Sequence, residues 1–160
     1  MTRTLILLRH AKSAWPEGIP DIQRPLSGRG RRDAPAAGRW LRGKAPKIDL
    51  VLCSPAVRAV QTWNLASAQL DVMPQLNHDD RLYGASAGEL LRITQELPHQ
   101  ASTVVLVGHN PGLEDFLELL TGTAEVLKTS AIAVMATQVT WAQTADRSCT
   151  LEAFAIPRGE

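Results

Sequence analysis

Two arginines and two histidines stand where apolar segments of the chain end. Arg9 and His10 follow the run "LILL", Arg58 comes shortly after "LVLC", and His109 follows "VVLVG". Guanidinium groups bind phosphate oxygens through paired hydrogen bonds, and a neutral imidazole nitrogen is a good nucleophile near pH 7. These residue types predict a site that binds a phosphoryl group and takes it up on a histidine.

The apolar runs predict strands, and the segments between them predict helices. We expect strands at 4–8, 49–54, 103–109, 131–137 and 149–156, with a short strand or extended connection at 70–76. We expect a helix at 28–41 that is capped by Ser27, a helix at 55–69 with Pro55 as its first residue, and a helix at 87–97. A fourth helix should begin at Pro111, with Asn110 as its cap, and run to about residue 120. The loop predicted at 77–86 contains His78.

Alternating strands and helices predict a three-layer α/β sandwich, in which helices cover both faces of a mostly parallel sheet. Such sheets bind ligands at the carboxyl ends of their strands. Arg9, His10, Arg58 and His109 all lie at or just beyond such ends. If the strands are neighbours, the four side chains meet in one pocket, with helix N-termini nearby that also favour phosphate.

Length and composition are those of a globular protein with a single domain, residues 1–160. Hydrophobic residues make up 44% of the chain and charged residues 21%. No apolar run approaches the ~20 residues of a membrane span, and no signal peptide is recognisable at the start. We therefore expect a cytoplasmic monomer that does not bind a membrane.

Charge is distributed unevenly along the chain. Residues 1–60 hold 12 Lys and Arg against 4 Asp and Glu, whereas residues 61–160 hold 5 against 12. A basic portion suits an anionic ligand, although a solvated helix face accounts for many of these arginines. Aromatic residues are only 4% of the chain and are not interleaved with basic ones, so we expect no nucleic-acid partner.

Three segments resemble the signatures of the histidine phosphatase superfamily, which is also called phosphoglycerate-mutase-like. "LLRHAKS" is similar to its first-histidine motif, "SPAVRAVQT" to its SPxxRAxxT segment and "VLVGHNPGL" to its second-histidine segment. The segments occur in the family's order and span the chain. The short length, which leaves no room for a large cap, resembles the small phosphohistidine phosphatases (SixA-like).

The resemblance implies a role for each matching residue. His10 corresponds to the nucleophile that takes up the phosphoryl group, Arg9 and Arg58 to the clamps on its oxygens, and His109 to the second histidine that stabilises charge at phosphorus. Cationic groups of this kind offset the phosphoryl charge without a metal. No HExxH, paired-Asp or CxxC spacing is present, so we expect no metal site and no cofactor.

The proton donor is less clearly marked. Family members that cleave esters often carry Glu in a segment like NERxYG, and the corresponding "DDRLYG" here presents Asp80. Asp80 is therefore the candidate donor, with a solvated loop carboxylate as the alternative. Glu89 is a second candidate, although an acid in the first turn of a helix is favoured there in any case. Ala11 replaces the usual Gly, so its backbone must adopt a φ that a Cβ tolerates.

The predicted function is a metal-independent phosphatase that acts through a phosphohistidine intermediate. A phosphohistidine-bearing protein is the favoured substrate, because an uncapped pocket admits a protruding side chain. A small phosphate ester is the nearest alternative. A non-catalytic module that binds phosphorylated ligands is a third possibility, but arginines alone would suffice for binding, so the His10 and His109 pair argues for catalysis.

Overall fold

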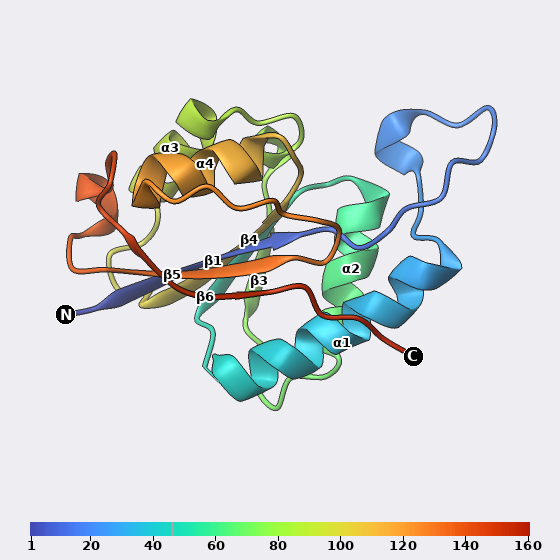
Figure 1. The fold of residues 1–160 in the computed structure, drawn as a ribbon, viewed down its shortest axis with the longest axis horizontal. Coiled ribbons are helices and arrows are strands. Elements are labelled where there is room, and N and C mark those ends of the chain that lie inside the picture. Colours follow the sequence, from blue (N-terminus) through green and yellow to red (C-terminus); the bar gives the residue numbers. More distant parts are fainter. Residues whose placement is uncertain (46) are drawn as a thin grey trace.

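The computed structural model describes residues 1–45 and 47–160, which form one central sheet with helices on both faces (Figure 1). The strands are β1 (Arg3–Arg9), β2 (Leu50–Cys53), β3 (Gln75–His78), β4 (Thr103–Gly108), β5 (Ile132–Thr137) and β6 (Thr150–Ala155). The helices are α1 (Gly28–Lys44), α2 (Val57–Ser67), α3 (Ala87–Gln95) and α4 (Gly112–Thr121), with short 3₁₀ helices η1 (Asp21–Gln23), η2 (Asp80–Leu82) and η3 (Trp141–Gln143). The predicted three-layer α/β sandwich is confirmed.

The sheet has the strand order β3-β2-β4-β1-β5-β6. The strands β3, β2, β4 and β1 are parallel to one another, whereas β5 is antiparallel to both β1 and β6. The sheet is therefore mostly parallel, as predicted, with β5 as the one reversed strand in the described part of the chain. Each parallel connection contains a helix, because a parallel pair needs a long crossover.

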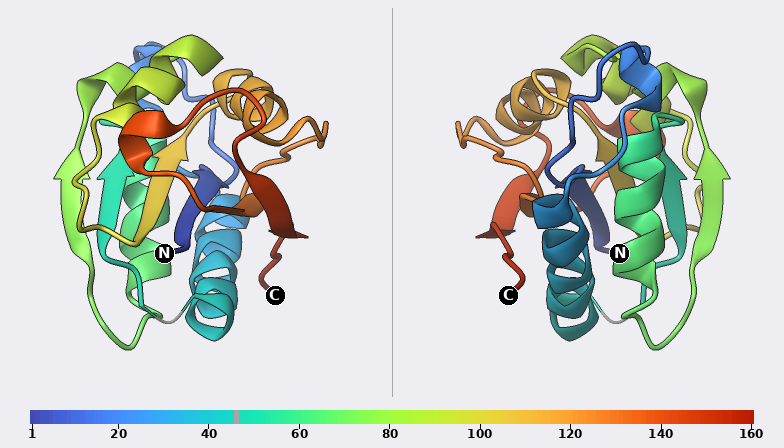
Figure 2. Two further views of the ribbon diagram at one scale, coloured as in Figure 1. Left: turned by 90° about the vertical axis from the view of Figure 1, so that its left-hand side faces the viewer. Right: turned by 90° about the vertical axis from the view of Figure 1, so that its right-hand side faces the viewer.

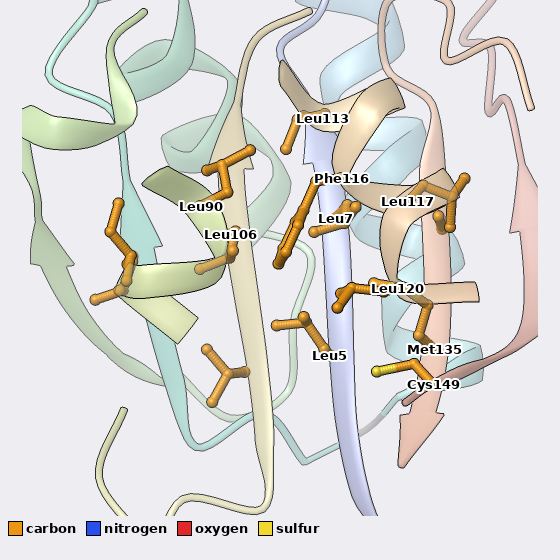
Figure 3. Close-up of a cluster of buried hydrophobic side chains, with 14 of the residues drawn as sticks. Leu5, Leu7, Leu90, Leu106, Leu113, Phe116, Leu117, Leu120, Met135 and Cys149 are labelled. Carbon is orange, nitrogen blue, oxygen red and sulfur yellow. The ribbon is translucent and has the colours of Figure 1, made fainter. Parts of the chain in front are cut away.

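Side chains of the central strands alternate between two hydrophobic clusters. In β1, Leu5 and Leu7 point into the cluster under α3 and α4, whereas Ile6 and Leu8 point into the cluster under α1 and α2. Figure 3 shows the first cluster, in which Phe116 of α4 lies against Leu5 and Leu7. Removing such a side chain from water stabilises a fold by ~1.5–3 kcal/mol, so this burial holds both helix layers on the sheet.

Local signals at the helix starts are partly confirmed. Ser27 caps α1 as predicted, because its Oγ accepts a hydrogen bond from the N–H of Gly30 at 3.2 Å. The prediction for α2 is wrong by two residues. Its helix begins at Val57 rather than Pro55, because the Ser54 Oγ accepts the N–H of Ala56 and holds a turn before the helix.

Two further local predictions are wrong. Asn110 does not cap α4, which begins at Gly112, because the Asn110 amide donates instead to the carbonyl of Leu127 at 2.7 Å. His78 lies in the edge strand β3 rather than in a loop, since its backbone pairs with that of Cys53 in β2. Neither difference moves the carboxyl ends of β1, β2 and β4.

Candidate active site

The carboxyl ends of three neighbouring strands bring the predicted residues together. The strand β4 lies between β1 and β2, with Arg9 in register with Gly108 and Cys53 in register with Val107. The residues that follow these positions therefore share one edge of the sheet. His10 and His109 meet there, with ring centroids 5.1 Å apart.

The His10 ring is held in one orientation. Its Nδ1–H donates to the carbonyl of Ala11 at 2.8 Å, and the Ala11 N–H donates to Thr62 Oγ1 at 2.9 Å. Thr62 in turn donates to the carbonyl of Arg58 at 2.7 Å, so the loop after β1 is tied to the first turns of α2. Because Nδ1 carries the proton, the lone pair of the neutral ring is on Nε2.

Burial keeps His10 neutral. The residue is only 6% exposed, and this burial lowers its pKa to about 3. The hydrogen bond to Ala11 opposes the shift, whereas the nearby His109 and the arginines reinforce it. The ring is therefore unprotonated at neutral pH, the form in which an imidazole can act as a nucleophile. Ala11 has no positive φ, as the loss of the family's glycine requires.

The two arginines are anchored on one side and lie close enough to repel each other. The Arg9 Nη1 donates to the carbonyl of Leu127 at 2.9 Å, and burial, together with the charge of Arg58, lowers the pKa of Arg9, although Glu114 opposes this. Arg58 is 6% exposed and donates two hydrogen bonds to Asp21, from Nη1 to the backbone carbonyl and from Nη2 to the carboxylate. Two nearby cations, of which Arg58 is buried and Arg9 half-buried, favour an anion between them.

His109 is positioned by the loop after β2. Its Nε2 is hydrogen-bonded to the hydroxyl of Ser54 at 2.8 Å, and Ser54 is fully buried. The hydroxyl has no other acceptor among the described residues, so it donates to Nε2 and the proton of the neutral ring is on Nδ1. Burial, together with Arg58, lowers the pKa of His109 to about 4, which keeps the ring neutral.

Three N–H groups of this cluster are buried and unpaired. Within the described residues, Arg9 Nε, Arg58 Nε and His109 Nδ1 have no hydrogen-bond partner. A buried donor without a partner costs about 1–3 kcal/mol, and an anion that accepts all three would recover this. The cluster thus has the donors for a tetrahedral oxyanion and a nucleophile, His10 Nε2, beside them.

Sequence reasoning missed two residues at this site, Asp21 and Tyr83. The Asp21 carboxylate accepts from Arg58 Nη2 at 3.0 Å, from Arg24 Nε at 3.1 Å and from the Tyr83 hydroxyl. Tyr83 also presents its ring edge-on to His109, with centroids 5.6 Å apart. Figure 1 and the right-hand view of Figure 2 place the segment that carries η1 beyond the first turn of α2.

The carboxylates of Asp80 and Glu89 are not part of this cluster of contacts. Asp80 is exposed at the start of η2, three residues before Tyr83, and its side chain forms no hydrogen bond with the described residues. Glu89 is exposed and accepts the N–H of Ser86 at 3.0 Å, which completes the capping box of α3 and lowers the pKa of Glu89. Glu89 therefore has a structural role at the helix start.

Space for part of a ligand lies beside His109. A pocket of about 290 Å³ is lined there by 84–86, 109–112 and Asp115.

Among the described residues no group of His, Cys, Asp and Glu side chains could hold a metal ion, and no helix is long and apolar enough to cross a membrane. Cys53 and Cys149 are buried free thiols.

A model of the histidine phosphatase superfamily (branch 1) matches residues 5–103, which is more than half of the chain. The chain belongs to this superfamily. An uncharacterised protein of Mycobacterium tuberculosis is 39% identical over 162 residues, which cover 94% of this chain and 100% of the relative. The matched residues include the segments around His10 and Arg58, whereas the segment around His109 lies beyond them.

Solved structures narrow the family further. A protein of Nakamurella multipartitia assigned as a SixA phosphohistidine phosphatase superposes with a TM-score of 0.87 and 33% identity, over 98% of this chain and 97% of that one. The protein histidine phosphatase SixA, solved with tungstate, superposes with a TM-score of 0.83 over 96% and 97% of the chains, and at 23% identity it shows the fold alone. The chain is a phosphatase of the SixA-like branch with the phosphoglycerate-mutase-like fold.

Proposed function

We propose that this phosphatase removes the phosphoryl group from phosphohistidine on a protein, with His10 as the nucleophile and without a metal ion. The observation that carries the proposal is the set of three buried, unpaired N–H groups around the His10 ring, from Arg9, Arg58 and His109. They match the three oxygens of a phosphoryl group in number, and the two guanidinium groups carry the opposite charge. The neutral His10 ring beside them supplies the attacking lone pair.

In the first step, His10 Nε2 attacks phosphorus. The new P–N bond forms as the bond to the leaving group breaks, and the leaving group keeps the electron pair. Arg9 and Arg58 stabilise the charge on the phosphoryl oxygens, and the Nδ1–H of His109 donates to one of them. The proton on His10 Nδ1 stays hydrogen-bonded to Ala11, so the ring carries one positive charge once it is phosphorylated.

In the second step, water hydrolyses the phosphoenzyme. The water oxygen bonds to phosphorus, its proton leaves to the product phosphate or to solvent, and the electron pair of the broken P–N bond returns to His10 Nε2. The positively charged phosphohistidine ring is a good leaving group, so this step needs little acid catalysis. The same arginines hold the phosphoryl group in both steps.

Two observations support a protein substrate. The Nakamurella relative is assigned as a phosphohistidine phosphatase, and it aligns over nearly the whole chain. In addition, two segments next to the site expose large apolar side chains: Trp15 (74% exposed) and Ile19 (36%) in the loop before η1, and Tyr83 (36%) after η2. Exposed apolar groups of this kind suit contact with another protein.

The test is to trap the phosphoenzyme. Rapid quenching after mixing with a ³²P-labelled phosphohistidine peptide should yield a labelled protein that loses its label in acid and keeps it in base. His10→Ala should abolish both trapping and turnover, because the nucleophile is gone. The matched control is His78→Ala, on the exposed strand β3, which should leave trapping and turnover unchanged.

Turnover should also continue in EDTA, because the arginines supply the positive charge that a metal would otherwise provide. Activity that survives His10→Ala and is lost in EDTA would contradict the proposal. Turnover of phosphate esters without turnover of the phosphohistidine peptide would be consistent with His10 as the nucleophile but would contradict the proposed substrate.

A further inference from the structure

Asp21 places a carboxylate at the edge of a site built for an anion. Its side chain is 50% exposed and lies against Arg58, which is almost fully buried. Hydrogen bonds from Tyr83, Arg58 and Arg24 lower the pKa of Asp21 to about 2, so it is ionised at neutral pH. A negative charge here opposes the binding of a phosphate group, so the presence of this carboxylate needs a functional explanation.

The reaction geometry shows which part of a substrate meets Asp21. Nucleophile and leaving group lie on opposite sides of phosphorus in an in-line displacement. His10 and Arg58 are each 6% exposed and form the inner layer of the site, whereas Asp21 and Tyr83 are exposed and form the outer layer. A leaving group that belongs to a protein must extend outward to solvent, so it passes the outer layer.

The Asp21 carboxylate has capacity for one more donor. An ionised carboxylate offers about four lone-pair positions, and three are used by Arg58, Arg24 and Tyr83. A phosphate ester of serine or of a sugar brings no charged N–H to this place. The imidazole of phosphohistidine does, on the ring nitrogen that does not carry phosphorus.

We propose that Asp21 accepts a hydrogen bond from this N–H of the leaving imidazole and thereby makes the site prefer phosphohistidine to phosphate esters. The inference rests on the proposed function and identifies the residue that sets its substrate class. A carboxylate next to the ring favours the protonated ring, which is the form that leaves readily.

The step balances without a proton from the enzyme. As His10 Nε2 bonds to phosphorus, the P–N bond of the substrate breaks and its electron pair stays on the departing nitrogen. The proton on the other ring nitrogen stays on that nitrogen and remains hydrogen-bonded to the Asp21 carboxylate. The protonated substrate ring therefore leaves as neutral imidazole, and Asp21 stays ionised throughout.

The experiment compares Asp21→Asn with Glu96→Gln. Glu96 is a matched control, because it is a carboxylate of similar exposure, 53%, paired with Arg81 outside the site. Asp21→Asn should lower kcat/KM for a phosphohistidine peptide about 10- to 100-fold, the range for losing a hydrogen bond to a charged group. Hydrolysis of p-nitrophenyl phosphate should fall much less or rise, and Glu96→Gln should change neither.

Two further readouts separate this role from that of a support for Arg58. The affinity for tungstate should stay equal or increase in Asp21→Asn, because a like charge is removed while the backbone carbonyl of residue 21 still accepts from Arg58. The alkaline limb of kcat/KM for the peptide should move down by about one pH unit. The other charged or titratable groups facing Asp21 are Arg58 on α2, Arg24 in its own segment, Tyr83 after η2 and His109 after β4.

The possible failures are distinct. No turnover of the peptide by the wild-type protein would overturn the proposed function. Normal turnover that Asp21→Asn leaves unchanged would overturn this inference alone. Equal losses on peptide, aryl phosphate and tungstate would also overturn it, because they would show that Asp21 acts only by holding Arg58.

Discussion

His10 should make the stability of the fold decrease as the pH is lowered from 7 to 5. Burial lowers the pKa of its imidazole to about 3, whereas an unfolded histidine titrates at about 6.5. Between these two values the unfolded chain binds a proton that the folded protein does not bind. The free energy of unfolding therefore falls with falling pH through this window.

The size of this loss can be worked out from the two pKa values. An unfolded histidine is about one quarter protonated at pH 7 and almost fully protonated at pH 5, whereas folded His10 stays neutral at both. Integration over the window gives about 2 kcal/mol, a large part of a typical net stability of 5–15 kcal/mol. The result changes little as long as the folded pKa lies well below 5.

The contribution of Asp21 falls outside this window. Its folded pKa is lowered to about 2, so the stability it adds is complete above the unfolded value of about 3.8 and is lost only as the pH falls through the folded value. His109, whose pKa is lowered to about 4, adds a loss of the same sign as His10. That loss is common to the wild-type protein and to variants of His10.

Urea denaturation at pH 7 and pH 5 measures the effect, in buffers free of phosphate and sulfate, since oxyanions would raise the histidine pKa. The wild-type protein should lose about 2 kcal/mol more than His10→Asn between the two pH values. His78→Ala, which removes an exposed histidine, should lose as much as the wild type. Equal losses for wild type and His10→Asn would show that folded His10 titrates like an unfolded histidine, which would refute the lowering of its pKa by burial.

Two other substitutions test the clamp and the helix contact. Arg58→Lys should reduce turnover by about 10²–10³-fold and weaken tungstate binding, because an ammonium group cannot form the paired contacts of a guanidinium; Arg29→Lys on α1 should change neither. Gly38→Ala should lower the free energy of unfolding by ~1–3 kcal/mol, since its Cβ would overlap the carbonyl of Ala66, whereas Gly43→Ala in the same helix meets open space and should be neutral or stabilising in urea denaturation.

Much of the fold follows from the pattern of apolar residues. The runs around Ile6 and Val105 are long enough to be buried on both faces, which only a sheet covered by helices on both sides allows. Strand direction is not encoded in such runs, so the reversal of β5 could not be read from them. The direction of β5 depends on the end of the sheet from which the chain enters this strand after α4, which is a property of the whole topology.

The inner layer of the site was predictable because each residue is next to a strand end. Arg9, His10, Arg58 and His109 are brought together by the register of three parallel strands, and this register follows from the fold class. Asp21 and Tyr83 had no such signal. They lie 62 positions apart in loops and short 3₁₀ helices, and only their joint contact shows that they belong to the site.

Local competition explains the errors at the helix starts. Asn110 is a good capping residue by type, but a carbonyl from a distant segment, that of Leu127, takes its amide. Ser54 is likewise used twice, by the N–H of Ala56 and by His109, which places the start of α2 later than Pro55. In both cases the residue that departs from the local rule is one that shapes the active site.

A substitution of Asp80 tests whether ester cleavage and phosphohistidine cleavage differ in their need for a proton donor. An alkoxide is a poor leaving group, so an ester needs a proton in the transition state, which is worth typically about 10²–10⁴-fold. The imidazole of phosphohistidine already carries its proton. If Asp80 is a donor, Asp80→Asn should slow hydrolysis of an alkyl phosphate far more than that of a phosphohistidine peptide, whereas Asp71→Asn, another exposed carboxylate, should affect neither.

Values of kcat/KM for both substrates, measured side by side, decide the role of Asp80. Its exposed carboxylate has no hydrogen bond to the described residues, so none of them commits it to another role. Equal losses on the two substrates would mean that Asp80 supports the loop that leads to Tyr83. No loss on either would mean that it is a solvated carboxylate, and cleavage would then rely on leaving groups that arrive already protonated, as phosphohistidine does.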